Sequence, residues 1–214
     1  MPKSLRALVG DGSRDELVRS ARRLLRFHWT AGEAAGGAGP AHLAAFLLED
    51  ELLELLLDAD PAAAAARDAA GRTPLHYAAH ATERLRGLVY LFSPQPFATW
   101  LQRRSRSKLE FAPPVPARTL AAELAEAEVA AAAVLLRRGA DAAAADAAGV
   151  TPMHLAAEGG SVALLRLLHC AGGASLLGAR DGEGRDPLLA AAAGGQAEAL
   201  DLLRSLQADE SAEA

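Results

Sequence analysis

The chain has 214 residues, a formal net charge of −5 and a single cysteine. Nucleic-acid binding needs clustered basic residues on a generally basic surface, so this charge argues against nucleic acid as the main partner. One cysteine excludes an internal disulfide and suits a reducing compartment. No run of 18 uncharged apolar residues occurs, so we expect no membrane span.

The N-terminal region, residues 1–38, is expected to form a helical cap followed by a flexible connector. Apolar residues recur at helical spacing as far as Phe27, and a stretch rich in glycine and alanine follows. The arginines near the start also fit a transit peptide, but Asp11, Asp15 and Glu16 are acids that such peptides avoid. We therefore favour the cap, with a transit peptide as the alternative.

Three segments of the chain restate one another. They run from Asp68 to Ala79, from Asp146 to Ala157 and, in a more divergent copy, from Asp181 to Ala192. The second and third copies begin about 35 residues apart, and self-similarity at such a period indicates stacked structural repeats. In such an array, stability comes from contacts between neighbouring units rather than from one central core.

Each copy predicts the start of a short helix. A threonine, or Asp186 in the last copy, stands at the N-cap, and a proline follows at the first helical position. Paired alanines then favour helix and leave room for a neighbouring helix to approach. Six residues of the first two copies make up the structural repeat motif: Thr73, Pro74, His76, Thr151, Pro152 and His154.

A second helix is predicted after each first one, because apolar residues recur at three- and four-residue spacing. With fainter copies included, the sequence predicts about five units, near 39–61, 68–92, 118–142, 146–174 and 181–206. Residues 93–117 interrupt the spacing and read as an irregular insertion bracketed by prolines. Residues 207–214 read as an acidic disordered tail.

The Thr-Pro-Leu-His-Tyr-Ala and Thr-Pro-Met-His-Leu-Ala segments closely resemble the ankyrin repeat signature. The resemblance covers most of residues 39–206 and implies an all-α solenoid of helix-turn-helix units. It further implies that His42, His76 and His154 support the turns through hydrogen bonds. Its last implication is a concave protein-binding face, formed by the turn tips and the exposed sides of the first helices.

Nothing in the sequence supports catalysis. The recurring histidines occupy one repeat position and are therefore read as fold elements, and the acidic pairs lie in turns that the repeat requires. No zinc spacing, phosphate loop or dinucleotide fingerprint occurs, so we expect no metal and no cofactor. The predicted function is that of a non-catalytic, monomeric adaptor that binds a protein partner in the cytoplasm, with the nucleus as the alternative location.

Carried over by position, the resemblance marks eight candidate contact residues for the partner. Arg72, Tyr77 and His80 form the richest cluster, because arginine and tyrosine are favoured at binding hot spots. The full set is Arg72, Tyr77, His80, Val150, Leu155, Glu158, Glu183 and Arg185.

The alternative function is a regulatory or inhibitory subunit that acts on an enzyme through the 93–117 insertion. This insertion carries the densest positive charge in the chain, over residues 103–108. The basic run has three readings: a solvated loop, a kinase site on Ser105 or Ser107, and a nuclear-localisation or acidic-surface contact.

Overall fold

The computed structural model describes residues 37–80 and 117–213, and the regular elements in these two ranges are all helices. Most of the expected N-terminal cap and of the 93–117 insertion lies outside the described residues, as do Ser105 and Ser107. The labelled elements are α4 (Pro40–Phe46), α5 (Asp50–Ala59), η1 (Pro61–Ala65), α8 (Ala117–Arg137), α9 (Pro152–Glu158), α10 (Val162–Gly172), η2 (Ala174–Leu176), α11 (Pro187–Ala193) and α12 (Ala197–Glu213).

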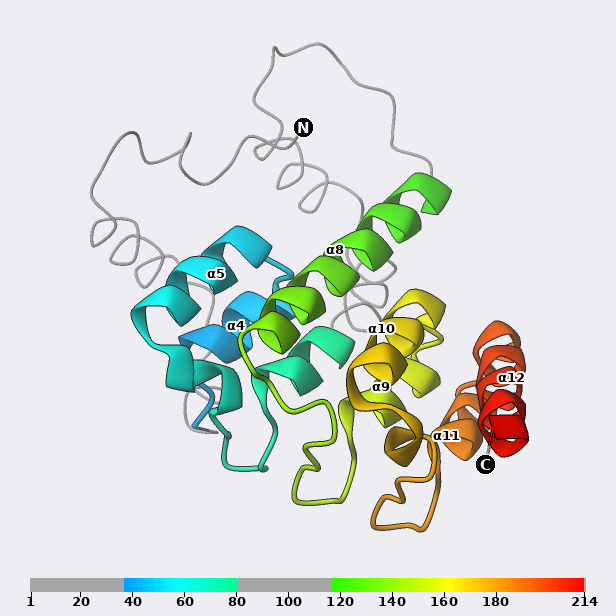
Figure 1. Cartoon of the computed structure of the whole chain (residues 1–214). Helices are drawn as coiled ribbons and strands as arrows, with labels where there is room; N and C mark the ends of the chain where they lie inside the picture. Colours follow the sequence, from blue (N-terminus) through cyan, green and yellow to red (C-terminus); the bar gives the residue numbers. More distant parts are fainter. Residues whose placement is uncertain (1–36, 81–116, 214) are drawn as a thin grey trace.

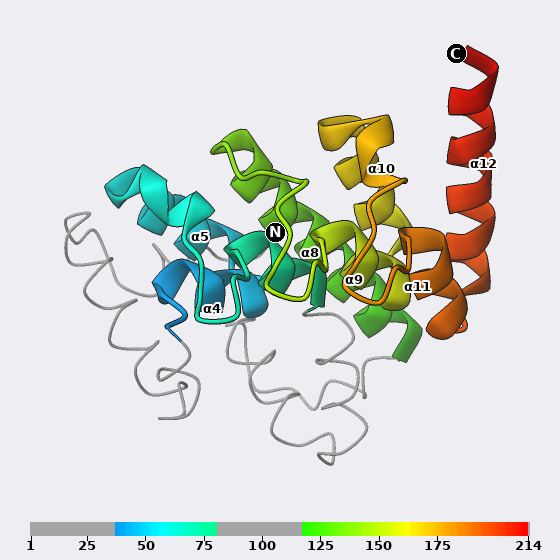
Figure 2. The ribbon, with the colours of Figure 1, turned by 90° about the horizontal axis from the view of Figure 1, so that it is seen from below.

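The helices form two layers, and the repeats stand in a row. The first layer holds the short helices α4, 74–80, α9 and α11, and the second holds α5, α8, α10 and α12. Within the layers, α9 packs on α11, while α8 packs on both α5 and α10. Figure 2 shows α4 and α5 at one end of the row and α12 at the other. The expected all-helical solenoid is thus confirmed.

The segment 118–142 does not form a unit of its own, contrary to the prediction. Residues 117–137 are one continuous helix, α8, because this alanine-rich run contains no glycine or proline to interrupt it. Arg137 of α8 pairs with Glu54 of α5 at 3.0 Å. On its other side, Glu128 of α8 accepts a bond from Ser161 at 2.6 Å. The helix therefore occupies the second-layer place of the repeat that begins at Asp68.

The turns confirm this assignment. Figure 1 shows the loops before the helical segment 74–80, before α9 and before α11 projecting side by side from one edge of the stack. The Ala147 N–H donates to the Ala70 carbonyl at 2.8 Å, and the Gly182 N–H donates to the Ala148 carbonyl at 2.7 Å. The turn at 68–72 therefore lies directly against the turn at 146–150. The described residues hold four stacked helix pairs rather than five.

Glycine is required where neighbouring turns meet. Gly71 and Gly149 have φ values of 77° and 76°, in the left-handed region that favours glycine. A Cβ at either position would come within 3.0 Å of a backbone nitrogen in the following turn. These two positions therefore limit how closely successive turns can stack.

Small residues in the first layer let the helices approach closely. Leu75 and Met153, the first apolar residues after the prolines, are fully buried. The alanine pairs that follow them are also buried, as the sequence predicted: Ala78, Ala79, Ala156 and Ala157. A Cβ on Gly194 would lie only 2.2 Å from the Glu158 carbonyl oxygen, which shows how tightly the α9 and α11 ends pack.

The end of the described chain is helical where a disordered tail was expected. Residues 207–213 continue α12, because they include good helix formers and no glycine or proline. The Glu210 carboxylate lies 2.9 Å from the His169 ring nitrogen on α10, so these turns are held against the array. No helix within the described ranges is long and apolar enough to cross a membrane.

The leucines of the second layer form the contact between repeats. Leu168 of α10 is fully buried, and Leu56 and Leu203 at the expected equivalent positions are also buried. In α8 the fully buried residue is Leu135, whereas the predicted equivalent, Leu136, is only partly buried.

We expect Leu168→Ala to lower the free energy of unfolding by about 2–5 kcal/mol, because it removes a buried side chain and leaves a cavity between repeats. Leu189→Ala is the matched control, because Leu189 is 49% exposed and should change the unfolding midpoint little. Urea unfolding followed by circular dichroism measures both. Equal midpoints for the two variants would contradict the packing described for α10.

Candidate functional site

An aspartate shapes each turn, and it is buried in the first and last of the three. The Oδ1 atom of Asp68 accepts the backbone N–H groups of Ala70 and Arg72 at 2.9 and 2.8 Å. Asp146 and Asp181 make the same pair of bonds to the residues two and four positions further on. An aspartate that bonds its own backbone in this way fixes the turn conformation. These carboxylates are therefore part of the turn, as the sequence predicted for the acidic residues there.

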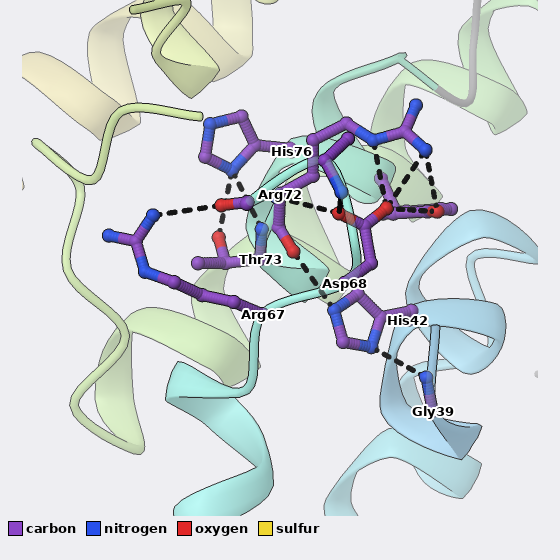
Figure 3. Close-up of polar contacts among 10 residues, drawn as sticks. Gly39, His42, Arg67, Asp68, Arg72, Thr73 and His76 are labelled. Atoms are coloured by element: carbon purple, nitrogen blue, oxygen red, sulfur yellow. Dashed lines mark hydrogen bonds and ion pairs between the residues drawn. The ribbon is translucent and has the colours of Figure 1, made fainter. Parts of the chain in front are cut away.

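Arg72 and Tyr77 converge on the second oxygen of Asp68, and Figure 3 shows Arg72 beside this carboxylate. The Arg72 Nε donates to Oδ2 at 2.9 Å, and the Tyr77 hydroxyl donates to the same oxygen at 2.8 Å. The Arg72 guanidinium also lies over the Tyr77 ring, 5.0 Å from its centre. Burial raises the pKa of Asp68, but the Arg72 backbone N–H, the Tyr77 hydroxyl and the Arg72 guanidinium outweigh it and hold the pKa below 3.8.

This network gives Arg72 and Tyr77, two residues of the predicted hot-spot cluster, a structural role within the turn. The structure does bring Arg72 and Tyr77 together, with 3.1 Å between the Arg72 Nη2 and the Tyr77 hydroxyl. However, both groups serve a carboxylate whose side chain is only 1% exposed. Truncating either residue would remove bonds from a buried charge, so we expect such changes to destabilise the fold as well as to alter the surface.

Tyr77→Phe should lower the free energy of unfolding by about 1.5 kcal/mol, because it removes one hydrogen bond to a charged group and leaves the ring in place. Its control is Tyr77→Phe in an Asp68→Asn background, where the acceptor is no longer a carboxylate and the added loss should be smaller. Chemical denaturation of the four proteins gives the coupling free energy. Strictly additive losses would show that the hydroxyl does not act through Asp68.

The repeated histidine connects each repeat to the next. The backbone N–H of Thr151 donates to the Nδ1 atom of His154 at 3.2 Å, so the ring proton must sit on Nε2. That Nε2–H donates to the Arg185 carbonyl of the next turn at 3.0 Å. His76 bonds the Val150 carbonyl and His42 the Arg72 carbonyl in the same manner. The predicted role of these histidines in supporting the turns fits this geometry.

Thr151 and His154 are linked at the start of α9, where the threonine hydroxyl lies 2.8 Å from the His154 Nδ1. Thr73 has the same contact with His76 at 2.9 Å. The Thr151 hydroxyl therefore contacts the histidine ring, whereas the sequence predicted that it would accept an N–H of the first helical turn. In the last repeat, Asp186 caps α11 directly by accepting the Leu189 N–H at 2.8 Å, as the sequence predicted.

Two of the histidines resist protonation. Burial lowers the pKa of His42 and of His76 below 6.5, and this outweighs the bonds to the Arg72 and Val150 carbonyls, which act in the opposite direction. The Nδ1 atom is already an acceptor of a backbone N–H in both rings, so a proton there would break the cap. The charged neighbours are Asp68 and Arg72 for His42, and Asp146, Arg67 and Arg72 for His76.

The array should lose stability as the pH falls below about 6.5. A folded-state pKa below the unfolded value means that the unfolded chain binds more protons in this range, so stability is complete above pH 6.5 and declines as the pH falls. Urea midpoints at pH 7.5 and 5.5 measure the change. Both pH values lie well above the lowered pKa of the Asp68 and Asp181 carboxyls, so these groups stay ionised throughout. His76→Leu should show a smaller pH dependence, and an unchanged one would contradict this origin.

An arginine that the sequence analysis did not single out links two turns. The Arg67 Nη1 donates to the Gly71 carbonyl at 2.8 Å and to the Ala145 carbonyl of the following turn at 2.7 Å. Arg180, at the same position in the last turn, donates to the Gly184 carbonyl at 2.8 Å. The recurrence of arginine directly before the turn aspartate was the available signal.

The other candidate contact residues differ in exposure. Glu158 and Glu183 are exposed, whereas Val150, Leu155 and Arg185 are half-buried. Arg185 pairs with Asp181 at 2.8 Å and lies 3.4 Å from Glu183. His80 is half-buried and is the last described residue before the gap. Pro74 and Pro152 are buried at the starts of their helices, as the motif predicted.

The described residues contain no group of histidine, cysteine and carboxylate side chains that could hold a metal ion. The single cysteine, Cys170, is exposed on α10. Each histidine of the repeat position uses both ring nitrogens in bonds to the chain, which leaves neither for proton transfer.

Residues 119–213 match the family model described as "Ankyrin repeats (3 copies)". The match begins within α8 and ends in α12. Residues 37–80 lie outside it but share the same turn and histidine bonds. A search of curated proteins found no match.

Proposed function

This chain is an ankyrin repeat protein, and on that premise we propose that it is a non-catalytic adaptor whose protein partner binds the turns and first helices. Ankyrin repeats are generally protein–protein interaction modules. We call the proposed contact surface the turn face, and define it by the turn residues Ala69, Ala147, Ala148 and Glu183 and the first-helix residues Leu155 and Glu158.

The observation that carries the proposal is that different residues of each turn hold its conformation and face the solvent. The aspartates and histidines hold the backbone through hydrogen bonds, while the residues at the tips are exposed, namely Ala69, Ala147, Ala148 and Glu183. A surface that is already held in one conformation loses little entropy when a partner binds. The turn tips are therefore suited to recognition, with alanine allowing close approach and the glutamates providing charge.

Arg72 and Tyr77 remain part of the proposed contact, because about 40% of the Arg72 side chain is exposed beside the Tyr77 ring. Their bonds to Asp68 make them poor test positions, since a binding loss there would be mixed with a loss of stability. Glu158 and Glu183 are better positions, because both are exposed. We further propose that the adaptor works as a monomer in the cytoplasm.

A photo-crosslinking amino acid placed at Glu158 or Glu183 should capture the partner in the source cell. Arg166 on α10 and Asp201 on α12 are matched exposed positions in the second layer and serve as controls. We expect the same protein to be captured from both turn-face positions and from neither control, identified by mass spectrometry. Capture from Arg166 and Asp201 alone would place the partner on the second-helix layer and refute the turn face.

A further inference from the structure

The junction between the second and third repeats is held by two bonds, and the last described turn carries the equivalents of the two groups that make them on the side of the second repeat. At the junction of the second and third repeats, Arg67 donates to the Ala145 carbonyl and the Ala70 carbonyl accepts the Ala147 N–H. Counted from the turn aspartate, the equivalents in the last repeat are Arg180 and the Glu183 carbonyl. The last turn therefore presents the groups that elsewhere hold the next turn.

Nothing in the described ranges lies against this edge. A Cβ on Gly184 would meet no atom within 4 Å, whereas one on Gly71 or Gly149 would meet the next turn at 3.0 Å. Gly184 has the same left-handed backbone, with a φ of 77°. Among the described residues, no backbone N–H donates to the Glu183 carbonyl. Arg180 bonds only its own turn, where Arg67 also reaches the next one.

An apolar side chain stands beside this open edge. Leu189 occupies the position that holds His76 and His154 in the preceding repeats, and it is 49% exposed where those rings are at most 2% exposed. It is the one exposed large apolar side chain of the described residues. Since leucine cannot donate to a carbonyl, this position favours contact with an apolar group.

We propose that the edge formed by Arg180, Glu183, Gly184 and Leu189 is a second protein-binding site, which takes an extended peptide segment of a partner protein. Arg180 bonds a backbone carbonyl of the segment, and the Glu183 carbonyl accepts the N–H two residues further on, as Ala145 and Ala147 do inside the array. An apolar side chain of the segment packs on Leu189. Backbone bonds give such a site affinity, and the apolar contact gives it selectivity.

The internal junctions favour a partner peptide over a second copy of this chain. The turns at 68–72, 146–150 and 181–185 each already lie against the turn before them, so a second copy would have to open a junction to offer one. The site shares only Glu183 with the proposed turn face, and it uses the backbone carbonyl of that residue at the end of the row of turns rather than its side chain.

Two variants test the site in the intact chain. Leu189→Glu replaces the exposed apolar side chain, and Gly184→Asn fills the open edge with a residue that tolerates a positive φ. Ala163→Glu, at an exposed position of α10, is the matched control for added charge. Glu158→Arg marks the turn face. Unfolding midpoints confirm that each variant is folded. If Leu189→Glu does not fold, Leu189→Ser takes its place.

The probe is a displayed library of linear twelve-residue peptides, selected on the parent protein, and the selected peptides are then titrated by fluorescence polarisation. We expect the selected peptides to contain an apolar residue. Their affinity for the Leu189→Glu and Gly184→Asn variants should be at least tenfold lower than for the parent protein, and their affinity for Ala163→Glu and Glu158→Arg should be unchanged. Failure to select such a peptide would overturn the site. Sedimentation equilibrium showing a dimer that Leu189→Glu abolishes would make the occupant a second copy and overturn the proposal.

Discussion

In the first three repeats, the imidazole ring in the fourth position of the first helix, counted from its N-cap, determines how the repeats stand relative to one another. One nitrogen accepts the N-cap N–H of its own helix, and the other donates to a carbonyl of the next turn. A helix start and a neighbouring turn are thereby fixed to the same rigid ring. Because the bond is repeated by His42, His76 and His154, a regular row of turns results.

This arrangement uses most of the polar chemistry of the turns for their own construction. The turn aspartates are bonded to backbone N–H groups, and two of the three turns add an arginine to the same carboxylate. The middle turn has Val150 in that position and lacks the ion pair. The groups that remain exposed in the turns are backbone edges and a few side chains.

The repeat motif was predictable from the sequence because every copy solves the same local problem, that of capping a short helix behind a tight turn. Residues Thr73, Thr151 and Asp186 therefore lie where the pattern placed them. The false unit at 118–142 arose because a second helix ends with the same leucines and glycine wherever its first helix lies in the sequence. The bonds between the two turns, such as the one from Ala147 to Ala70, show that no turn stands between these two repeats.

The candidate site was less predictable. Arg72 and Tyr77 have the composition of a hot spot, but their contact with Asp68 depends on the turn conformation and leaves no periodic signal in the chain. The acids of residues 207–213 indicated a tail, yet helix propensity and the contact between Glu210 and His169 keep that segment helical. In both cases the outcome depended on a contact partner distant in sequence or on the exact turn geometry, and composition reveals neither.

The placement of α8 has a consequence for the order in which the molecule folds. The second repeat takes its two helices from residues 74–80 and 117–137, so the contacts between these helices join parts of the chain that are far apart in sequence. Contacts of large sequence separation form more slowly than local ones. The third and fourth repeats are contiguous, and we expect folding to nucleate there. The second repeat would then assemble on that surface, with α8 docking against α10 before the N-terminal repeat is added.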